Sequence, residues 1–203
     1  RGAIRPQAPR ALLGAGTGLG QAILVWQSDH YEVLSSEGGH VDFAPVNEVQ
    51  FALWRALSTQ YGHVSYERLL SGQGLHDIFR HLAVSGSPPS ELLAALQGEG
   101  DAAALISEFG LSHRDPMAYA ALALFTDIYG QQAGNLALTT RAEGGIYIAG
   151  GIAPKLIQQL RTGGFMEAFR AKGRYREWLS SLPVAVVMNP KVGLLGAVLA
   201  AGR

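Results

Sequence analysis

The stretch ALLGAGTGLGQAILVWQ, residues 11–27, sets how the chain begins to fold. Its two apolar runs, 11–14 and 21–27, flank the turn Gly14-Ala15-Gly16-Thr17-Gly18-Leu19-Gly20 and predict a β-hairpin. The turn has neither the lysine of a P-loop nor the glycine spacing of a dinucleotide motif, and a strand follows it where those motifs open a helix. Its backbone N–H groups and the Thr17 hydroxyl could cradle an anion. A flexible hairpin tip is the alternative.

Further strands and helices follow this hairpin. Strands are expected over residues 31–35, 145–149 and 183–188, and helix caps at Asn47 and Asp115. Helices are expected over residues 46–60, 65–70, 74–84, from 87–90 onward, from 116 towards 138, over 154–161, in two pieces within 165–179, and over 192–201. A hairpin followed by alternating strands and helices predicts an α/β fold with a mixed sheet and flanking helices.

Composition excludes several classes of function. The 203 residues include 16 basic and 16 acidic side chains, so the cationic surplus of a nucleic-acid binder is missing. The chain has no cysteine for disulfides, thiolate zinc sites or a cysteine nucleophile, which suits a reducing cytoplasm. No run approaches the roughly 18 apolar residues of a membrane span. The 26 glycines exceed the roughly 14 that average usage predicts, and the surplus needs an explanation.

The segment Glu37-Gly38-Gly39-His40 places a carboxylate and an imidazole three residues apart across two glycines. Glycines let a backbone approach a ligand closely while the two side chains converge on it. A solvated turn before a strand is the alternative. One histidine and one carboxylate are too few for a metal site, so no metal ligand is predicted. Glu67 follows Ser65 at an expected helix start, where the helix dipole alone would explain an acidic residue.

The segment Ile148-Ala149-Gly150-Gly151-Ile152 leads from a predicted strand through two glycines towards a helix. Ligands of open α/β sheets bind at such junctions, and glycines leave room for a flat group such as a nucleobase. A tight strand-to-helix turn is the alternative. The remaining histidines are expected on the surface or in the core, without a catalytic role: His30, His63, His76, His81 and His113.

Taken together and in this order, the segments resemble the bacterial glucokinase family of the hexokinase and actin-like ATPase superfamily. The resemblance rests on the glycine turn 14–20, on EGGHVDFAP at 37–45, on GHVSYERLLSG at 62–72 and on IAGGI at 148–152. It extends from around Ala11 to the C-terminus. A related class of sugar kinases also has a Glu-x-Gly-His segment but adds a cysteine-rich zinc loop, for which this chain has no cysteines.

The resemblance implies the large lobe of an actin-like ATPase fold, which is ribonuclease H-like. It also implies an enzyme that transfers the γ-phosphoryl group of MgATP to the 6-hydroxyl of glucose. Glucose and ATP are then the partners, without nucleic acid or membrane, and the cytoplasm is the expected location. Glu37, His40 and Glu67 would bind the sugar hydroxyls, which charge-assisted hydrogen bonds hold well.

For the cofactors ATP and Mg²⁺, the resemblance implies two glycine-rich loops. Gly16, Thr17 and Gly18 would form the second phosphate loop, with Thr17 near the terminal phosphates. Gly150 and Gly151 would border the adenosine. Phosphoryl transfer in such a site depends on positioning and charge neutralisation more than on covalent chemistry.

Two family motifs are missing from the sequence: an Asp-x-Gly-Gly-Thr phosphate hairpin and an Asn-Asp pair that supplies the general base. We therefore expect a fragment, with residues 1–10 a linker or arm, residues 11–203 the large lobe, no catalytic residue in the chain, and activity lost or severely impaired. A non-catalytic sugar- or nucleotide-binding module and a kinase for another hexose are the alternatives.

The last helix adds a prediction about partners. In the family, the helix that corresponds to residues 192–203 returns to the N-terminal lobe. Residues 192–201 carry no charge, so a helix there needs cover on every face. Without that lobe we expect exposed apolar surface, and with it self-association or a homodimer.

Overall fold

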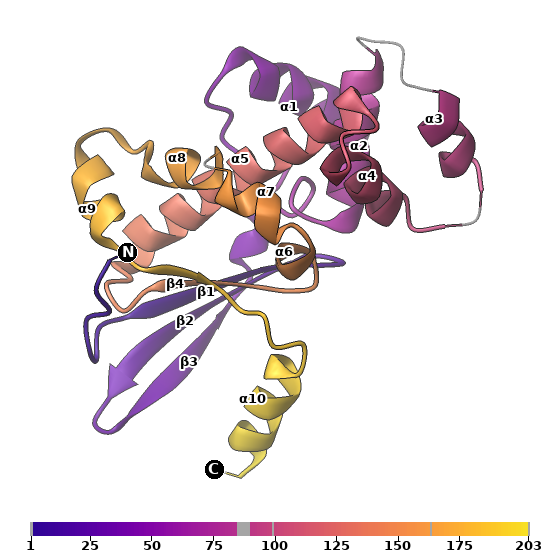
Figure 1. The fold of residues 1–203 in the computed structure, drawn as a ribbon. Helices are drawn as coiled ribbons and strands as arrows, with labels where there is room; N and C mark the ends of the chain where they lie inside the picture. The colour runs from indigo at the N-terminus through magenta and orange to yellow at the C-terminus, as the bar shows by residue number, and fades with distance from the viewer. Residues whose placement is uncertain (1, 85–89, 99, 163, 203) are drawn as a thin grey trace.

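The computed structural model describes residues 2–84, 90–98, 100–162 and 164–202. Within these ranges five strands form one sheet in the order β3-β2-β1-β4-β5 (Figure 1). The strands are β1 (Arg10–Ala15), β2 (Leu19–Gln27), β3 (His30–Ser36), β4 (Ile146–Ala149) and β5 (Val184–Val186). β1, β2 and β3 pair antiparallel, whereas β4 runs parallel to both β1 and β5. The predicted hairpin and the predicted mixed sheet are therefore confirmed.

Helices pack against this sheet and against one another, apart from the last one, which projects away from the others in Figure 1. They are α1 (Glu48–Tyr61), α2 (Gly72–Val84), α3 (Ser90–Leu96), α4 (Ala102–Leu111), α5 (Pro116–Thr140), α6 (Ile152–Lys155), α7 (Ile157–Arg161), α8 (Gly164–Arg170), α9 (Arg176–Ser181) and α10 (Val192–Ala201). Two short 3-10 turns, η1 (Gly38–His40) and η2 (Gly173–Tyr175), complete the described structure.

Two helix predictions were wrong, and a third lies outside the described residues. Residues 65–70 form a turn, because the Tyr66 and Glu67 N–H groups donate to Val41 O and Gly39 O instead of forming a helix. The helix predicted over 154–161 is divided into α6 and α7 at Leu156, whose φ of −96° and ψ of 15° are not helical. The helix start expected at 87–90 falls mostly on residues 85–89, which are not described.

The core is organised around α5, of whose 25 residues fifteen are buried. Asp115 caps this helix as predicted, since its carboxylate accepts from Met117 N–H at 2.8 Å and Ala118 N–H at 3.0 Å. Gly130 and Gly134 let α8 approach closely, because a Cβ at either would overlap a carbonyl oxygen of α8. Part of the glycine surplus therefore serves helix packing and not a ligand loop.

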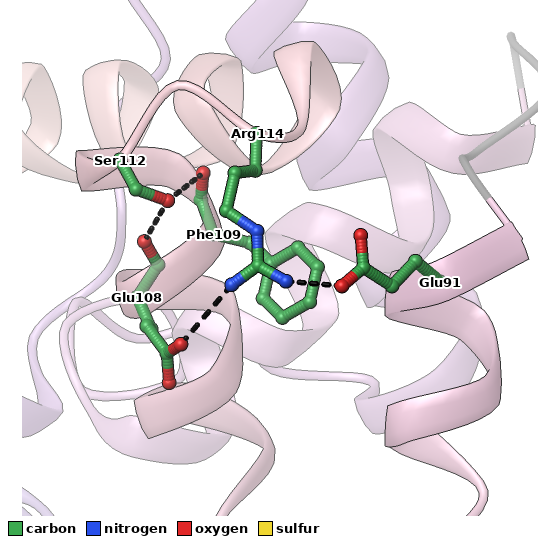
Figure 2. Close-up of polar contacts among 5 residues, drawn as sticks. All are labelled: Glu91, Glu108, Phe109, Ser112 and Arg114. Carbon is green, nitrogen blue, oxygen red and sulfur yellow. Dashed lines mark hydrogen bonds and ion pairs between the residues drawn. The ribbon is translucent and has the colours of Figure 1, made fainter.

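An arginine ties the peripheral helix α3 to the rest of the helical layer (Figure 2). Arg114, between α4 and α5, forms ion pairs with Glu91 of α3 and, at 3.3 Å, with Glu108 of α4. Its guanidinium group also lies 4.0 Å from the centre of the Phe109 ring. Ser112 Oγ closes the end of α4 by donating to Glu108 O at 2.7 Å. These contacts fix α4, whose opposite end borders the site described below.

The C-terminal helix α10 has the opposite environment to α5. None of its ten residues is buried, and Leu194 and Leu199 are 65% and 70% exposed. This exposure agrees with the prediction for a helix that needs cover on every face but lacks the N-terminal lobe. Among the described helices, none combines the length and the hydrophobicity that a membrane crossing requires.

Candidate functional site

The glycine hairpin, defined here as Ala15 to Leu19, connects β1 to β2 and is closed by a hydrogen bond from Gly16 N–H to Gly18 O at 2.8 Å. Tyr129 of α5 lies beneath it. Its hydroxyl oxygen accepts from Ala15 N–H at 3.2 Å and lies 3.4 Å from Ala149 O at the end of β4. Burial raises the pKa of the Tyr129 hydroxyl far above its usual range, so the group stays neutral. One buried hydroxyl therefore holds the ends of β1 and β4 together.

The turn after β4 lies directly against the glycine hairpin. Gly150 has a φ of +81°, and a Cβ there would come within 2.8 Å of Ala15 N. Both the dihedral angle and the close approach require glycine at this position. The predicted cofactor loops, 16–18 and 150–151, are thus neighbours in space although they lie more than a hundred residues apart.

A cavity of about 730 Å³ opens beside the glycine hairpin. Three of the predicted cofactor residues line it, namely Gly16, Thr17 and Gly151, whereas Gly18 and Gly150 do not. Its volume lies in the ordinary range of small-molecule pockets. The remaining walls come from α2, the start of α4, and α6: Gly72, Gln73, Leu75, His76, Gly100, Asp101, Ala102, Ala103, Ala104, Ser107, Ile152, Lys155 and Leu156.

Sequence reasoning missed the α4 wall of this cavity. Asp101 caps α4 by accepting from Ala103 N–H and Ala104 N–H at 3.0 and 3.2 Å. The run Asp-Ala-Ala-Ala does signal a helix start, yet nothing in it indicates which element the helix faces. His76 also lines the cavity, and burial, partly offset by Asp77, lowers the pKa of its imidazole.

The Glu–His cluster, made of Glu37, His40 and Glu67, lies at the Leu19 end of the hairpin, where Leu19 N–H donates to Glu67. His40 Nε2 lies 3.8 Å from Glu37 Oε2 and 3.7 Å from Glu67 Oε1. Glu37 and His40 are well exposed, and the Glu67 side chain is 31% exposed. Two carboxylates that accept hydrogen bonds and an imidazole that can donate therefore meet at one accessible point. The fold brings together all three residues that the sequence singled out for a sugar.

Glu67 occupies this position for a different reason than the sequence indicated. The dipole of a helix starting at Ser65 cannot explain it, because residues 65–70 form a turn. Its N–H donates to Gly39 O at 2.9 Å, and its Oε2 accepts from Leu19 N–H at 2.9 Å. Glu67 is therefore held by the two loops that it joins.

A buried polar network lies beneath the cluster. Asn135 of α5 donates to the Tyr66 hydroxyl at 2.9 Å, next to Glu67, and to Gln132 Oε1 at 3.2 Å. Gln132 Nε2 in turn donates to Gln21 Oε1 at 3.1 Å. The Lys172 ammonium group donates to Asn135 Oδ1 at 2.7 Å, and burial lowers the pKa of this lysine. No sequence motif pointed to Gln132, Asn135 or Lys172, of which Gln132 and Asn135 support the cluster from α5.

The described residues contain no group of three or more histidine, aspartate or glutamate side chains placed to hold a metal ion. Phosphate oxygens of a substrate and water molecules can also supply ligands to a divalent cation. Mg²⁺ is commonly bound in this way, through one or two carboxylates together with substrate phosphates.

Comparison with known proteins gives consistent matches. A profile of the glucokinase family matches residues 1–203. A glucokinase from Nostoc punctiforme is 40% identical over 216 residues, which cover 100% of this chain and 63% of the relative. The crystal structure of a glucokinase from an Antarctic psychrotroph has a TM-score of 0.84 and 32% identity, over 98% of this chain and 60% of its own.

A ROK family glucokinase from Streptomyces griseus, solved in complex with glucose and AMPPNP, shares the fold at a TM-score of 0.58 and 20% identity, over 97% of this chain and 61% of its own. These similarities identify the mixed sheet and its flanking helices as the actin-like ATPase fold. The chain spans less than two thirds of the length of these relatives. Because the family profile covers the whole sequence, the chain belongs to the glucokinase family.

Proposed function

We propose that the chain is the large lobe of a hexose kinase that transfers the γ-phosphoryl group of MgATP to the 6-hydroxyl of glucose. One observation carries the proposal: a single hairpin both lines a nucleotide-sized cavity and contacts the Glu–His cluster. Thr17 lines the cavity, and two residues further on Leu19 N–H binds Glu67. A sugar and a nucleotide that both bind beside this hairpin would lie close enough to react.

Glucose would bind at the Glu–His cluster. A neutral polyol offers only directional hydroxyl groups, and charged acceptors make stronger hydrogen bonds with them than neutral acceptors do. Glu37 and Glu67 would accept from sugar hydroxyls, and His40, less than 4 Å from both carboxylates, would fix the orientation of the ring. The 31% exposure of the Glu67 side chain leaves its Oε1 side open to a ligand.

ATP would occupy the 730 Å³ cavity, with Mg²⁺ as the accompanying ion. Thr17 and the backbone of Gly16 would face the terminal phosphates, and Gly151 would border the adenosine. Gly18 and Gly150 do not line the cavity and would complete the two loops behind these residues. Mg²⁺ would neutralise phosphate charge and would be held largely by the phosphates themselves. The reaction consumes ATP, and we propose the cytoplasm as its compartment.

The general base would belong to a part of the protein outside this sequence, since the Glu–His cluster is assigned to binding. Positioning the base and closing a second lobe over the substrates both contribute to phosphoryl transfer. We therefore propose that the chain binds both substrates but turns them over slowly or not at all.

Calorimetric titration of the chain with glucose and with ATP tests the binding sites. Glu37→Ala should weaken glucose binding about tenfold, because a hydrogen bond to a charged group contributes roughly 1.5–3 kcal/mol. Its matched control is Glu48→Ala on α1, which removes an exposed side chain of the same charge that does not belong to the cluster. Equal glucose affinity of the two variants would contradict the assignment, and tighter binding of another hexose would favour a different substrate.

A glucose-dependent ADP-release assay tests the proposal that this chain lacks the general base. We expect turnover at least about 10²-fold below that of a full-length glucokinase, the lower end of the usual effect of removing a positioned base. Turnover close to the full-length rate would show that the chain contains its own base and would overturn this part of the proposal.

We also propose that α10 packs against the N-terminal lobe in the full-length protein and leads to self-association without it. The support is its apolar, fully exposed surface, which includes Leu194 and Leu199. Light scattering should show concentration-dependent dimers or larger species, and Leu194→Lys with Leu199→Lys should reduce them. A clean monomer at high concentration would contradict the proposal.

A further inference from the structure

Glu67 touches both the Glu–His cluster and the glycine hairpin. Its Oε2 accepts from Leu19 N–H at 2.9 Å, and its Oε1 lies 3.7 Å from His40 Nε2. Because one carboxylate makes both contacts, a movement towards one partner changes its distance to the other. Glu67 therefore joins two elements to which the proposed function assigns different substrates.

Two glycines make this junction tight. A Cβ at Gly18 would lie 2.5 Å from Glu67 Oε2, and a Cβ at Gly39 would overlap the Leu19 carbonyl oxygen. The Gly39 carbonyl oxygen also accepts the Glu67 N–H at 2.9 Å. Leu19, only 4% exposed, is thus enclosed between Gly39 and Glu67. Close-packed groups transmit a displacement because no free volume absorbs it.

The other end of the hairpin is fixed at the cavity. Gly72 N–H donates to Gly16 O at 3.0 Å, and Gly72 lines the cavity together with Gly16 and Thr17. The hairpin is therefore held at Gly16 and at Leu19, with Thr17 between the two attachments. A shift of Leu19 reaches Thr17 through a closed turn of only a few residues.

We propose that Glu67 couples the Glu–His cluster to the glycine hairpin, so that glucose and nucleotide each increase the affinity of this chain for the other. The proposal rests on the proposed function for the identity of the two ligands. A sugar that orders the Glu67 carboxylate also orders the hairpin, and the ordering cost is then incurred only once for both ligands. The coupling needs no second lobe, because every contact lies within this chain, and it is reciprocal by thermodynamic necessity.

A pair of glycine variants tests the coupling from the nucleotide side. Glucose affinity is measured by calorimetry with and without a saturating non-hydrolysable ATP analogue. In the wild-type chain the analogue should tighten glucose binding at least about fivefold, the lower end of typical allosteric coupling. Gly18→Ala, whose methyl group would displace Glu67, should abolish this change. The control is Gly20→Ala, at an exposed position of β2 that is not assigned to either ligand, where a Cβ would meet nothing closer than Gly14 O at 4.0 Å, so it should retain the coupling.

Exchange of the Leu19 amide hydrogen, measured by NMR, tests the contact itself without any ligand. Glu67→Ala should accelerate this exchange about tenfold or more, since it removes a charged acceptor from a buried donor. Glu67→Gln should preserve the protection, because its side-chain carbonyl oxygen can still accept. Equal Leu19 exchange in the wild type and Glu67→Ala would overturn the inference.

The two proposals fail in different ways. A chain that binds neither glucose nor nucleotide would refute the proposed function and the coupling together. A chain that binds both without mutual effect, or in which Gly18→Ala couples as well as Gly20→Ala does, would refute the coupling alone.

Discussion

The helices α5 and α10 are alike in sequence and opposite in environment. Both are dominated by apolar and small residues with hardly any charge, α5 carrying Asp127 alone and α10 no ionisable side chain. Fifteen residues of α5 are buried, and none of α10. Uniform hydrophobicity therefore predicts that a helix needs cover on all sides, but it does not say what provides that cover.

The two helices also have different roles. α5 supports both candidate binding regions, through Tyr129 beneath the glycine hairpin and Asn135 beneath Tyr66. α10 projects away from the other helices (Figure 1). Substitutions in α5 should therefore affect folding and both sites, whereas substitutions in α10 should affect association. Three experiments test this contrast, in order of decreasing expected effect.

Truncation of a large side chain should give the largest difference in stability between a variant in α5 and a variant in α10. Phe125 on α5 is fully buried. Phe125→Ala should lower the free energy of unfolding by about 3–5 kcal/mol, because removal of the ring leaves a cavity. Leu199→Ala on α10 should change it by less than about 0.5 kcal/mol, as exposed positions usually do. Urea unfolding at low protein concentration measures both. A comparable loss at Leu199 would mean that α10 packs against the core in solution.

Glycine-to-alanine substitutions in the two helices should have opposite effects on stability. Gly130→Ala on α5 should destabilise the chain by about 1–3 kcal/mol, because its methyl group would overlap the Phe165 carbonyl oxygen. Gly196→Ala on α10 meets nothing within 4 Å and should stabilise its helix by up to about 1 kcal/mol. Thermal unfolding measures the first change and helical circular dichroism the second. A destabilising Gly196→Ala would show a close neighbour at α10.

Acidification should change the stability of the chain least of the three experiments. It should act through histidines that pack near α5 and not through α10, which has no ionisable side chain. Burial lowers the pKa of His76 and His81 on α2, which packs against α5, below their ordinary 6.5. Below about pH 6.5 the unfolded chain then binds more protons than the folded chain, so stability falls as the pH falls towards the folded-state pKa values. Urea unfolding between about pH 7.5 and pH 5.5 measures this fall.

The control for the pH experiment removes the two imidazoles. His76→Gln with His81→Gln should flatten the pH dependence, whereas Leu199→Lys on α10 should leave it unchanged. An unaltered slope in the double histidine variant would assign the pH dependence to other groups.

Local patterns predicted much of the fold. Apolar runs on either side of a glycine turn gave the hairpin, and Asp115 followed by Pro116 gave the start of α5. The same patterns failed at residues 65–70, where the sequence looks helical but the backbone N–H groups bind the loop at 39–41. A segment's own periodicity does not report a competing partner that lies far away in the sequence.

For the candidate site, the sequence by itself determined which loops and side chains we propose for it: Gly16–Gly18, Gly150–Gly151, Glu37, His40 and Glu67. Only the tertiary structure decided how they are connected. It showed the α4 wall of the cavity, the network under Tyr66, and the contact of Glu67 with Leu19. The physical reason is that residue types and spacing encode local backbone geometry, whereas contacts between distant segments depend on how all the elements pack together.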